Sequence, residues 1–320
     1  MRTLLHLSDL HFGRVDEALL APLSAFTRKL EPDVVVVSGD LTQRARTRQF
    51  QEARRFLDTL PQPQIVVPGN HDVPMHDILS RFLRPREKFR RYITNDANPE
   101  YVDDEIAVLG IDTARSLTIK NGRINEHQIE QMRAGFHAMS PRIAKIVVSH
   151  HPFDLPDHYD AGELVGRAPL AMQIFASCGV DLLLAGHLHV SHTGNTASRY
   201  RIDDYAALVV QAGTATSTRG RGESNSFNVI RIRLAASKSS ASPGNPMPRP
   251  SRPSRWSVSS AGRVDGNNGL MRSLAACARS IRWRLRALQV SRANVRHISC
   301  NAALCGSLHP DKWPHPIQAV

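Results

Sequence analysis

Short apolar runs alternate with amphipathic segments over residues 1–234. Runs such as DVVVVSGD (33–40) and VDLLLAGH (180–187) are rich in aliphatic residues and end at Gly followed by a polar residue, which is typical of buried strands. Six further runs of this kind lie at about 3–9, 64–72, 105–112, 145–152, 207–214 and 227–234. The segments between them predict helices at about 16–30, 46–60, 76–93, 126–138 and 168–178. Such alternation favours a layered α/β fold.

The pattern stops after Leu234, where a Ser-, Pro- and Arg-rich stretch begins. Such a composition cannot bury enough apolar surface to offset its ordering entropy, so we expect a folded body over 1–234 and a disordered tail over 235–320. Within the tail, residues 270–290 could form a basic amphipathic helix. The Cys300, Cys305 and His309 spacing lacks the second half of a zinc site, so a solvated tail is the preferred interpretation.

Charge and composition narrow the class of protein. The chain carries a net charge of +12, but residues 235–320 hold 13 Lys and Arg against two acids, which leaves +1 for the body. A near-neutral body gives little electrostatic reason to expect a polyanion as its main partner. No apolar run approaches the roughly 20 residues of a membrane span, and the N-terminus lacks the apolar segment of a signal peptide. We therefore expect a cytoplasmic protein, with its four cysteines reduced.

Polar residues with ligand-type side chains directly follow five of the apolar runs. They are Asp9 with His11, Asp40, Asn70 with His71, His150 with His151, and His187 with His189. Each motif alone can be an ordinary turn or a structural histidine. In open α/β sheets, however, ligands bind in the crevice beyond the carboxyl ends of the strands. Five coincidences of this kind together predict one site at that rim.

The ligand types indicate metal chemistry. Imidazoles, carboxylates and an amide oxygen, with no thiolate of the body placed to join them, suit Mn, Fe, Zn or Co, with Mn or Fe preferred. Seven ligands exceed what one such ion usually takes from protein, so we expect two ions that share a bridging carboxylate. Paired ions roughly 3.5–4 Å apart generate a hydroxide and clamp the oxygens of a phosphoryl group. This chemistry points to phosphoester hydrolysis.

At these residues the sequence resembles the calcineurin-like metallophosphoesterases. The ordered motifs of that family are D-x-H, G-D, G-N-H, H and G-H-x-H. They appear here as Asp9-Leu10-His11, Gly39-Asp40, Gly69-Asn70-His71, His150 and Gly186-His187-Leu188-His189. The match covers residues 3 to about 234, and nothing after 234 takes part in it.

The resemblance implies a four-layer sandwich, in which two central mixed β-sheets are flanked by helices. It also implies that Asp9, His11 and His189 hold one metal, that Asn70, His150 and His187 hold the second, and that Asp40 bridges them. His71 would lie outside the metal shell as the general acid for the leaving alkoxide. The first histidine of the 150–151 pair matches the ligand position, and His151 would lie in the outer shell.

One departure from the family pattern narrows the subgroup. Protein phosphatases of this superfamily have the motif G-D-x-x-D-R-G, whereas Asp40 is followed here by Leu-Thr-Gln-Arg. The second Asp of that motif is missing, so we do not expect a protein phosphatase. The wording is most similar to bacterial cyclic-nucleotide phosphodiesterases, so we expect small phosphodiesters such as 3′,5′-cyclic nucleotides as substrates. By position in the rim loops, Arg115, Arg167 and His158 are candidates for substrate selection.

Two alternatives remain open at this point. One is a nuclease of the DNA-repair branch, which shares these motifs and would be expected to present a basic groove or a capping domain. The other is a metal-dependent scaffold without turnover, whose basic tail recruits acidic partners. Oligomeric state does not follow from the sequence.

Overall fold

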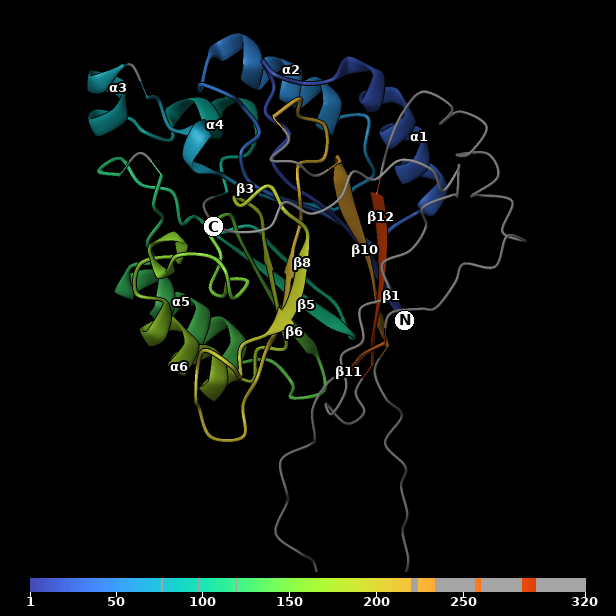
Figure 1. Ribbon diagram of the computed structural model, residues 1–320, viewed down its shortest axis with the longest axis vertical. Helices are drawn as coiled ribbons and strands as arrows, with labels where there is room; N and C mark the ends of the chain where they lie inside the picture. The colour runs from blue at the N-terminus through green and yellow to red at the C-terminus, as the bar shows by residue number, and fades with distance from the viewer. Residues whose placement is uncertain are drawn as a thin grey trace, which may run out of the picture.

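In a computed structural model, the protein is a four-layer sandwich in which helices cover the outer faces of two β-sheets (Figure 1). This arrangement confirms the expected fold. The structure describes residues 1–75, 77–96, 98–118, 120–219, 224–233, 257–259 and 284–291.

The first sheet is mixed. In spatial order, its described strands are β11 (Ser257–Ser259), β12 (Arg284–Ser291), β10 (Ser226–Arg233), β1 (Arg2–Leu7), β2 (Val34–Ser38) and β3 (Gln64–Val67). Strands β1, β2 and β3 run parallel, and β10 runs antiparallel to β1. The parallel trio therefore ends at one edge, and the polar residues after β1, β2 and β3 emerge there.

The second sheet is also mixed and has a parallel centre. Its described strands, again in spatial order, are β4 (Glu100–Val102), β5 (Ile106–Ile111), β6 (Ala144–Ser149), β7 (Leu182–Ala185), β9 (Leu208–Gln211) and β8 (His192–Asn195). Strands β5, β6, β7 and β9 are parallel, whereas the outer strands β4 and β8 are antiparallel to their neighbours. The two outer strands were not predicted, because three or four residues of mixed polarity carry too little periodicity to identify.

Side chains along each buried strand point alternately to its two faces, and together they build three apolar layers. In β2, Val34 and Val36 pack between the two sheets, whereas Val35 and Val37 pack under the helices of the first sheet. Successive strand residues point to opposite faces, so a strand that is buried on both sides reads as the continuous Val34–Val37 run. The middle layer joins the sheets through residues such as Ile146 and Leu184.

The helices fill the outer layers. The described ones are α1 (Leu20–Leu30), α2 (Thr47–Leu57), α3 (Ile78–Leu83), α4 (Glu87–Tyr92), α5 (Glu126–His137) and α6 (Ala168–Cys178), with short 3-10 turns η1 (Glu17–Leu19), η2 (Asn70–Asp72) and η3 (Ala161–Glu163). Apolar residues of α1, α2 and α4 pack on the first sheet, and those of α5 and α6 pack on the second. Asn125 caps α5 and Gly179 ends α6 in the left-handed conformation, which fixes where each helix begins or ends.

The predicted helix over 76–93 is wrong as a single element. The structure has two short helices, α3 and α4, with Arg84-Pro85-Arg86 between them. Proline lacks the amide donor and disfavours helical backbone in the preceding residue, so the segment breaks there.

The possible helix over 270–290, an alternative to a solvated tail, is not formed by its last residues, because 284–291 form β12. Strand β12 pairs in parallel with β10, from Ser226 opposite Arg284 to Arg233 opposite Ser291. The free edge of β10 offers unpaired backbone donors and acceptors, and an extended segment can satisfy them where an isolated helix cannot. Strands β11 and β12 likewise differ from the expected absence of regular structure. The Cys300, Cys305 and His309 motif lies outside the described residues, and the boundary at 234 stays a prediction.

No helix in the described part of the chain is both long and apolar enough to cross a membrane.

Candidate metal centre

Five strand ends deliver the predicted ligand residues to one place, where the edges of the two sheets meet. Strands β1, β2 and β3 lead to Asp9 with His11, Asp40 and Asn70, and strands β6 and β7 lead to His150 and to His187 with His189. All seven side chains belong to buried residues. The structure therefore brings together every residue that the sequence nominated as a metal ligand.

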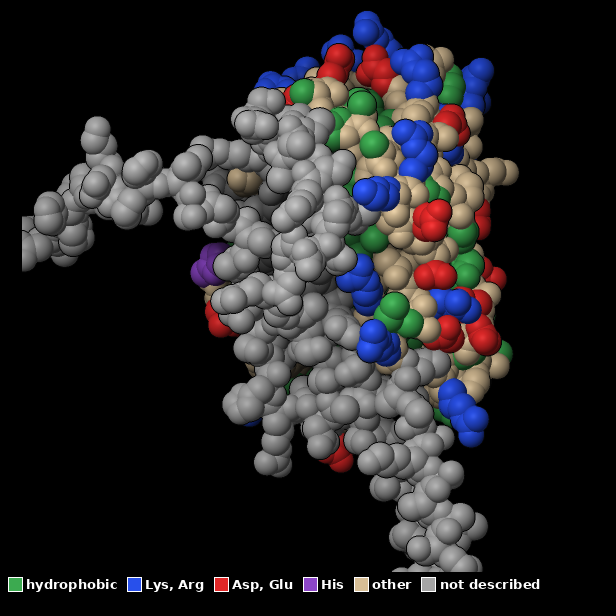
Figure 2. Space-filling view, turned by 90° about the vertical axis from the view of Figure 1, so that its right-hand side faces the viewer, with side chains coloured by type: hydrophobic (Ala, Val, Ile, Leu, Met, Phe, Trp, Pro, Cys, Tyr) green, Lys and Arg blue, Asp and Glu red, His purple; other side chains and the backbone are tan. Residues whose placement is uncertain are grey.

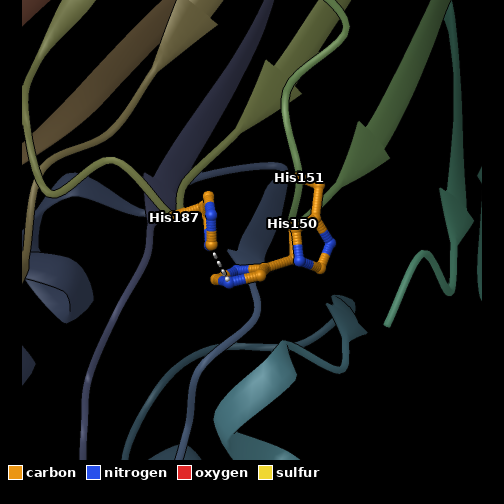
Figure 3. A group of neighbouring side chains, drawn as sticks. All are labelled: His150, His151 and His187. Atoms are coloured by element: carbon orange, nitrogen blue, oxygen red, sulfur yellow. Dashed lines mark hydrogen bonds between the residues drawn. The ribbon is translucent and has the colours of Figure 1, made fainter. Parts of the chain in front are cut away.

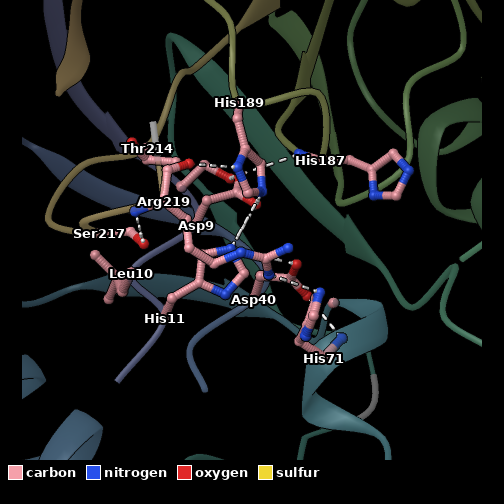
Figure 4. Close-up of polar contacts among 12 residues, drawn as sticks. Asp9, Leu10, His11, Asp40, His71, His187, His189, Thr214, Ser217 and Arg219 are labelled. Atoms are coloured by element: carbon pink, nitrogen blue, oxygen red, sulfur yellow. Dashed lines mark hydrogen bonds and ion pairs between the residues drawn. The ribbon is translucent and has the colours of Figure 1, made fainter. Parts of the chain in front are cut away.

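A first group forms around Asp9 (Figure 4). Its Oδ1 lies 3.2 Å from His189 Nε2 and 3.5 Å from His11 Nε2, and the two imidazole nitrogens are 3.2 Å apart. The other oxygen of Asp9, Oδ2, accepts hydrogen bonds from Ser8 Oγ and the His187 amide. Asp9 is thereby oriented so that Oδ1 faces the histidines, and Oδ1 has no hydrogen-bond partner among the described residues.

A second group forms around Asn70. Its Oδ1 lies 3.1 Å from His150 Nε2 and 3.2 Å from His187 Nδ1, and those two nitrogens are 3.2 Å apart (Figure 3). His150 Nδ1 is 2.8 Å from the carbonyl oxygen of Ser38. A nitrogen beside a carbonyl carries a proton, so Nε2 is the His150 nitrogen left to bind a metal, and without a metal it can donate a proton to Asn70 Oδ1.

Asp40 lies between the two groups. Its Oδ2 is 3.8 Å from His11 Nε2 in the first group and 3.4 Å from His150 Nε2 in the second. Its Oδ1 accepts the backbone amide of His71 at 2.8 Å. One carboxylate oxygen therefore faces the nitrogen donors of both groups, as a bridging ligand must.

The electrostatics of the site fit cations. Burial would raise the pKa of Asp40, but His150 and its neighbours hold that pKa well below the ordinary range. Burial lowers the pKa of His150, yet the Asp40 carboxylate raises it to about 9. Buried carboxylates thus stay ionised only where positive charge lies beside them, and protons on imidazoles can stand in for metal ions. The residues present fit two cations of borderline or hard character.

The backbone at the site is strained. Five of the nominated residues, Asp9, His11, Asp40, His187 and His189, have φ between 51° and 72°, in the left-handed region that non-glycine residues rarely adopt. Gly69 faces Asp40 so closely that a Cβ atom would lie 2.1 Å from Asp40 Oδ1. Strain of this kind persists where surrounding contacts fix it, and it concentrates at functional sites.

His71 lies beside the two groups, with its ring 5.0 Å from that of His11. Its Nδ1 is 2.8 Å from the Gln43 carbonyl oxygen, to which it donates, and its Nε2 accepts from Arg219 Nη1 at 3.2 Å. The next residue, Asp72, accepts the amides of Leu41, Thr42 and Gly69. Asp72 therefore ties the turn after β3 to the end of β2, which sets the position of His71.

His151 contacts the second group but is held by other partners. Its Nδ1 is 2.9 Å from Thr113 Oγ1 and its Nε2 is 2.8 Å from the Lys120 carbonyl oxygen. Both ring nitrogens are thus engaged, although the ring lies 4.6 Å from that of His187 (Figure 3). His151 lies with His150 and His187 in one cluster of potential metal ligands, and its two engaged nitrogens agree with the expectation that His150 is the ligand and His151 an outer residue.

The loop candidates for substrate selection have other described contacts. Arg167 pairs with Glu126 at 3.0 Å, and His158 is exposed and stacks beside Tyr159. The carbonyl oxygen of Arg115 accepts from Arg81. Sequence reasoning instead missed Arg219 and Glu163, which do reach the site. Neither belongs to a motif: Arg219 lies in the loop between β9 and β10, and Glu163 ends the short 3-10 turn η3, and the position of both segments depends on packing.

Glu163 orients His187 from behind. Its Oε2 lies 3.5 Å from His187 Nε2, at the outer limit of a hydrogen bond, and its Oε1 pairs with Lys120. The hydrogen bond to His187, then that to Lys120, hold the pKa of Glu163 down at about 2. A carboxylate on the far nitrogen fixes the tautomer and orientation of a metal-binding imidazole.

Replacing Glu163 with Ala is therefore expected to weaken metal binding about 10- to 100-fold. Titration of the metal-free protein with Mn²⁺ measures this. The Glu126→Ala variant is the matched control, because Glu126 pairs only with surface Arg167 in the described contacts. Equal Mn²⁺ affinity of the wild type and Glu163→Ala would remove Glu163 from the metal centre.

A four-layer α/β sandwich that gathers buried oxygen and nitrogen ligands around a shared carboxylate defines a metallophosphoesterase. The chain belongs to the calcineurin-like phosphoesterase family, whose model matches residues 2–191.

Named relatives of the chain are bacterial phosphodiesterases. It is 27% identical over 199 residues to the glycerophosphodiester phosphodiesterase GpdQ of Enterobacter lignolyticus, and this alignment covers 55% of this chain and 69% of the relative. It is 24% identical over 262 residues to a cAMP/cGMP dual specificity phosphodiesterase of Mycobacterium tuberculosis, which covers 72% and 75%. Among solved structures, a dimetal phosphatase from Danio rerio has the same fold, with a TM-score of 0.50 and 17% identity over 68% of this chain and 88% of that one.

Proposed function

We propose that the chain is a dinuclear metal-dependent phosphodiesterase that hydrolyses small phosphodiesters, with 3′,5′-cyclic nucleotides as the first candidates. The observation that carries the proposal is the position of Asp40. Its Oδ2 faces both ligand groups, so each group has four protein donors only if this carboxylate is shared. Two ions so placed would supply a hydroxide and neutralise charge on the phosphoryl oxygens.

The residues have distinct tasks in this proposal. Asp9, His11 and His189 hold one ion and Asn70, His150 and His187 hold the other, with Asp40 common to both. The Gln43 carbonyl keeps a proton on His71 Nδ1, so Nε2 is the nitrogen that can exchange a proton with a substrate oxygen. His71 thus serves as general acid for the leaving alkoxide.

Support for small phosphodiesters comes from relatives and from charge. Both named relatives act, by their names, on small phosphodiesters. Residues 1–234 carry a net charge of only +1, and on the one face that Figure 2 shows, Lys and Arg are interspersed with Asp and Glu over the described residues, which gives little electrostatic reason to expect a nucleic-acid substrate. We therefore rank nuclease activity as the second candidate function.

A substrate panel tests the proposal. Full-length protein loaded with Mn²⁺ is assayed with cyclic nucleotides, glycerophosphodiesters, phosphomonoesters and single-stranded DNA. We expect hydrolysis of cyclic nucleotides or glycerophosphodiesters well above that of DNA, abolished in Asp40→Asn. Cleavage of DNA alone would favour the nuclease. Tight Mn²⁺ binding with no turnover of any member would favour a scaffold.

Metal removal should lower stability as well as activity. Ions that bind only the folded state add about 2.7 kcal/mol per site when their concentration is about 100 times Kd. Stripping the protein with a chelator should therefore lower its melting temperature and stop turnover, and Mn²⁺ should restore both. A melting temperature that does not respond to Mn²⁺ would argue against binding at this buried site.

A further inference from the structure

We propose that Arg219, which lies beside His71 and His189, binds a non-bridging oxygen of the substrate phosphoryl group. The residue belongs to none of the motifs and lies in the loop between β9 and β10. The inference rests on the proposed function and identifies a residue that binds the phosphoryl group of the substrate.

Backbone contacts hold Arg219 beside the candidate metal centre. Its amide donates to Ser217 Oγ at 3.0 Å, and its carbonyl oxygen lies 3.2 Å from Nδ1 of His189. The side chain then extends to His71, where Figure 4 draws the contact between Nη1 and Nε2. The guanidinium thus ends beside the nitrogen that faces the substrate.

The guanidinium has no opposite charge to neutralise it among the described residues. Its contacts are neutral acceptors, His71 Nε2 at 3.2 Å and Gln43 Oε1 at 3.4 Å. Both contacts use Nη1, and no described hydrogen bond engages Nε or Nη2. Two other half-buried arginines have acidic partners instead: Arg86 pairs with Asp112, and Arg199 with Asp154. Arg219 alone among these three keeps a partly buried positive charge and free donors.

A phosphodiester can supply the negative charge and the hydrogen-bond acceptors that Arg219 lacks among its described contacts. It brings a negative charge and two non-bridging oxygens, and a planar guanidinium donates to such oxygens in a bidentate manner. Donors already in place where charge develops lower the barrier without reorganisation. Because Nη1 donates to His71 Nε2 in the free protein, a phosphoryl oxygen that draws Arg219 away leaves Nε2 able to take up a proton from solvent and to give it to the leaving alkoxide.

Inorganic phosphate is the probe for the test, and full-length Mn²⁺-loaded protein is used throughout. Arg219→Ala should raise the Kd of phosphate about tenfold or more and lower kcat/KM for diesters about 10²–10³-fold, with two metals retained. Guanidinium ion in the buffer should restore part of the lost turnover. Arg219→Lys should recover less than the wild type, because ammonium cannot donate as a fork.

Arg48→Ala is the matched control. Arg48 is an exposed arginine that pairs with Glu52 on α2, so its removal takes away the same charge without touching the site, and the phosphate Kd should stay within about threefold of the wild type. Unchanged phosphate binding in Arg219→Ala would overturn the proposal, as would equal losses in Arg48→Ala or loss of metal in Arg219→Ala. Phosphate binding that depends on Arg219 in a protein that hydrolyses no diester would uphold this inference and refute the proposed function instead.

Discussion

Replacing Asp40 with Asn is expected to leave a folded protein that holds fewer than two metal ions and has lost more than about 10²-fold in turnover. The change is nearly isosteric, and the amide oxygen can still accept the His71 amide that Oδ1 accepts now. It removes the one negative charge that faces both ligand groups. Loss of an outer-shell partner already costs 10–100-fold in affinity or activity, so loss of the shared ligand should cost more.

Elemental analysis of the purified protein measures this outcome, and circular dichroism shows whether the fold survives. Asp58→Asn serves as the control, because Asp58 is a surface partner of Arg54 on α2 and should keep full metal content. An Asp40→Asn protein with two tightly held ions would mean that Asp40 does not bridge, and the dinuclear assignment would fail.

His71→Ala is expected to keep both metals and lower phosphodiester turnover by about 10²–10⁴-fold, the usual share of general acid catalysis. His71 contributes no atom to either ligand group, because its Nδ1 is engaged by Gln43 and its Nε2 by Arg219. The backbone position of residue 71 depends on main-chain contacts, including the hydrogen bond from its amide to Asp40 Oδ1, and alanine retains these.

The leaving group gives the sharpest check on this role. A p-nitrophenolate leaves without a proton, whereas an alkoxide needs one, so the loss in His71→Ala should be much smaller for a nitrophenyl diester. His158→Ala is the control, since His158 is exposed beside Tyr159. Equal losses on both kinds of diester would assign His71 to substrate binding rather than to proton transfer.

Much of this protein could be predicted from local sequence. The Val34–Val37 run specifies a strand because branched aliphatic residues fit a sheet that is buried on both faces. Asp9, Asp40 and His150 could be nominated because each follows such a strand, and parallel strands end at a common rim. One failure was local, since the helix predicted over 76–93 breaks at Pro85. The other was not, because the strand at 284–291 pairs with β10, a segment distant in the sequence.

The sequence by itself determined the buried central strands and the ligand-type residues at their ends, because these depend on neighbours a few positions away. Tertiary structure decided how the ends combine. Asp9 meets His189, and Asp40 meets His150, only because the first sheet packs on the second. The same packing turned Arg219 and Glu163 toward the centre and His151 toward Thr113. No local pattern encodes such contacts, since they join residues more than 20 positions apart and form only when the apolar layers are buried together.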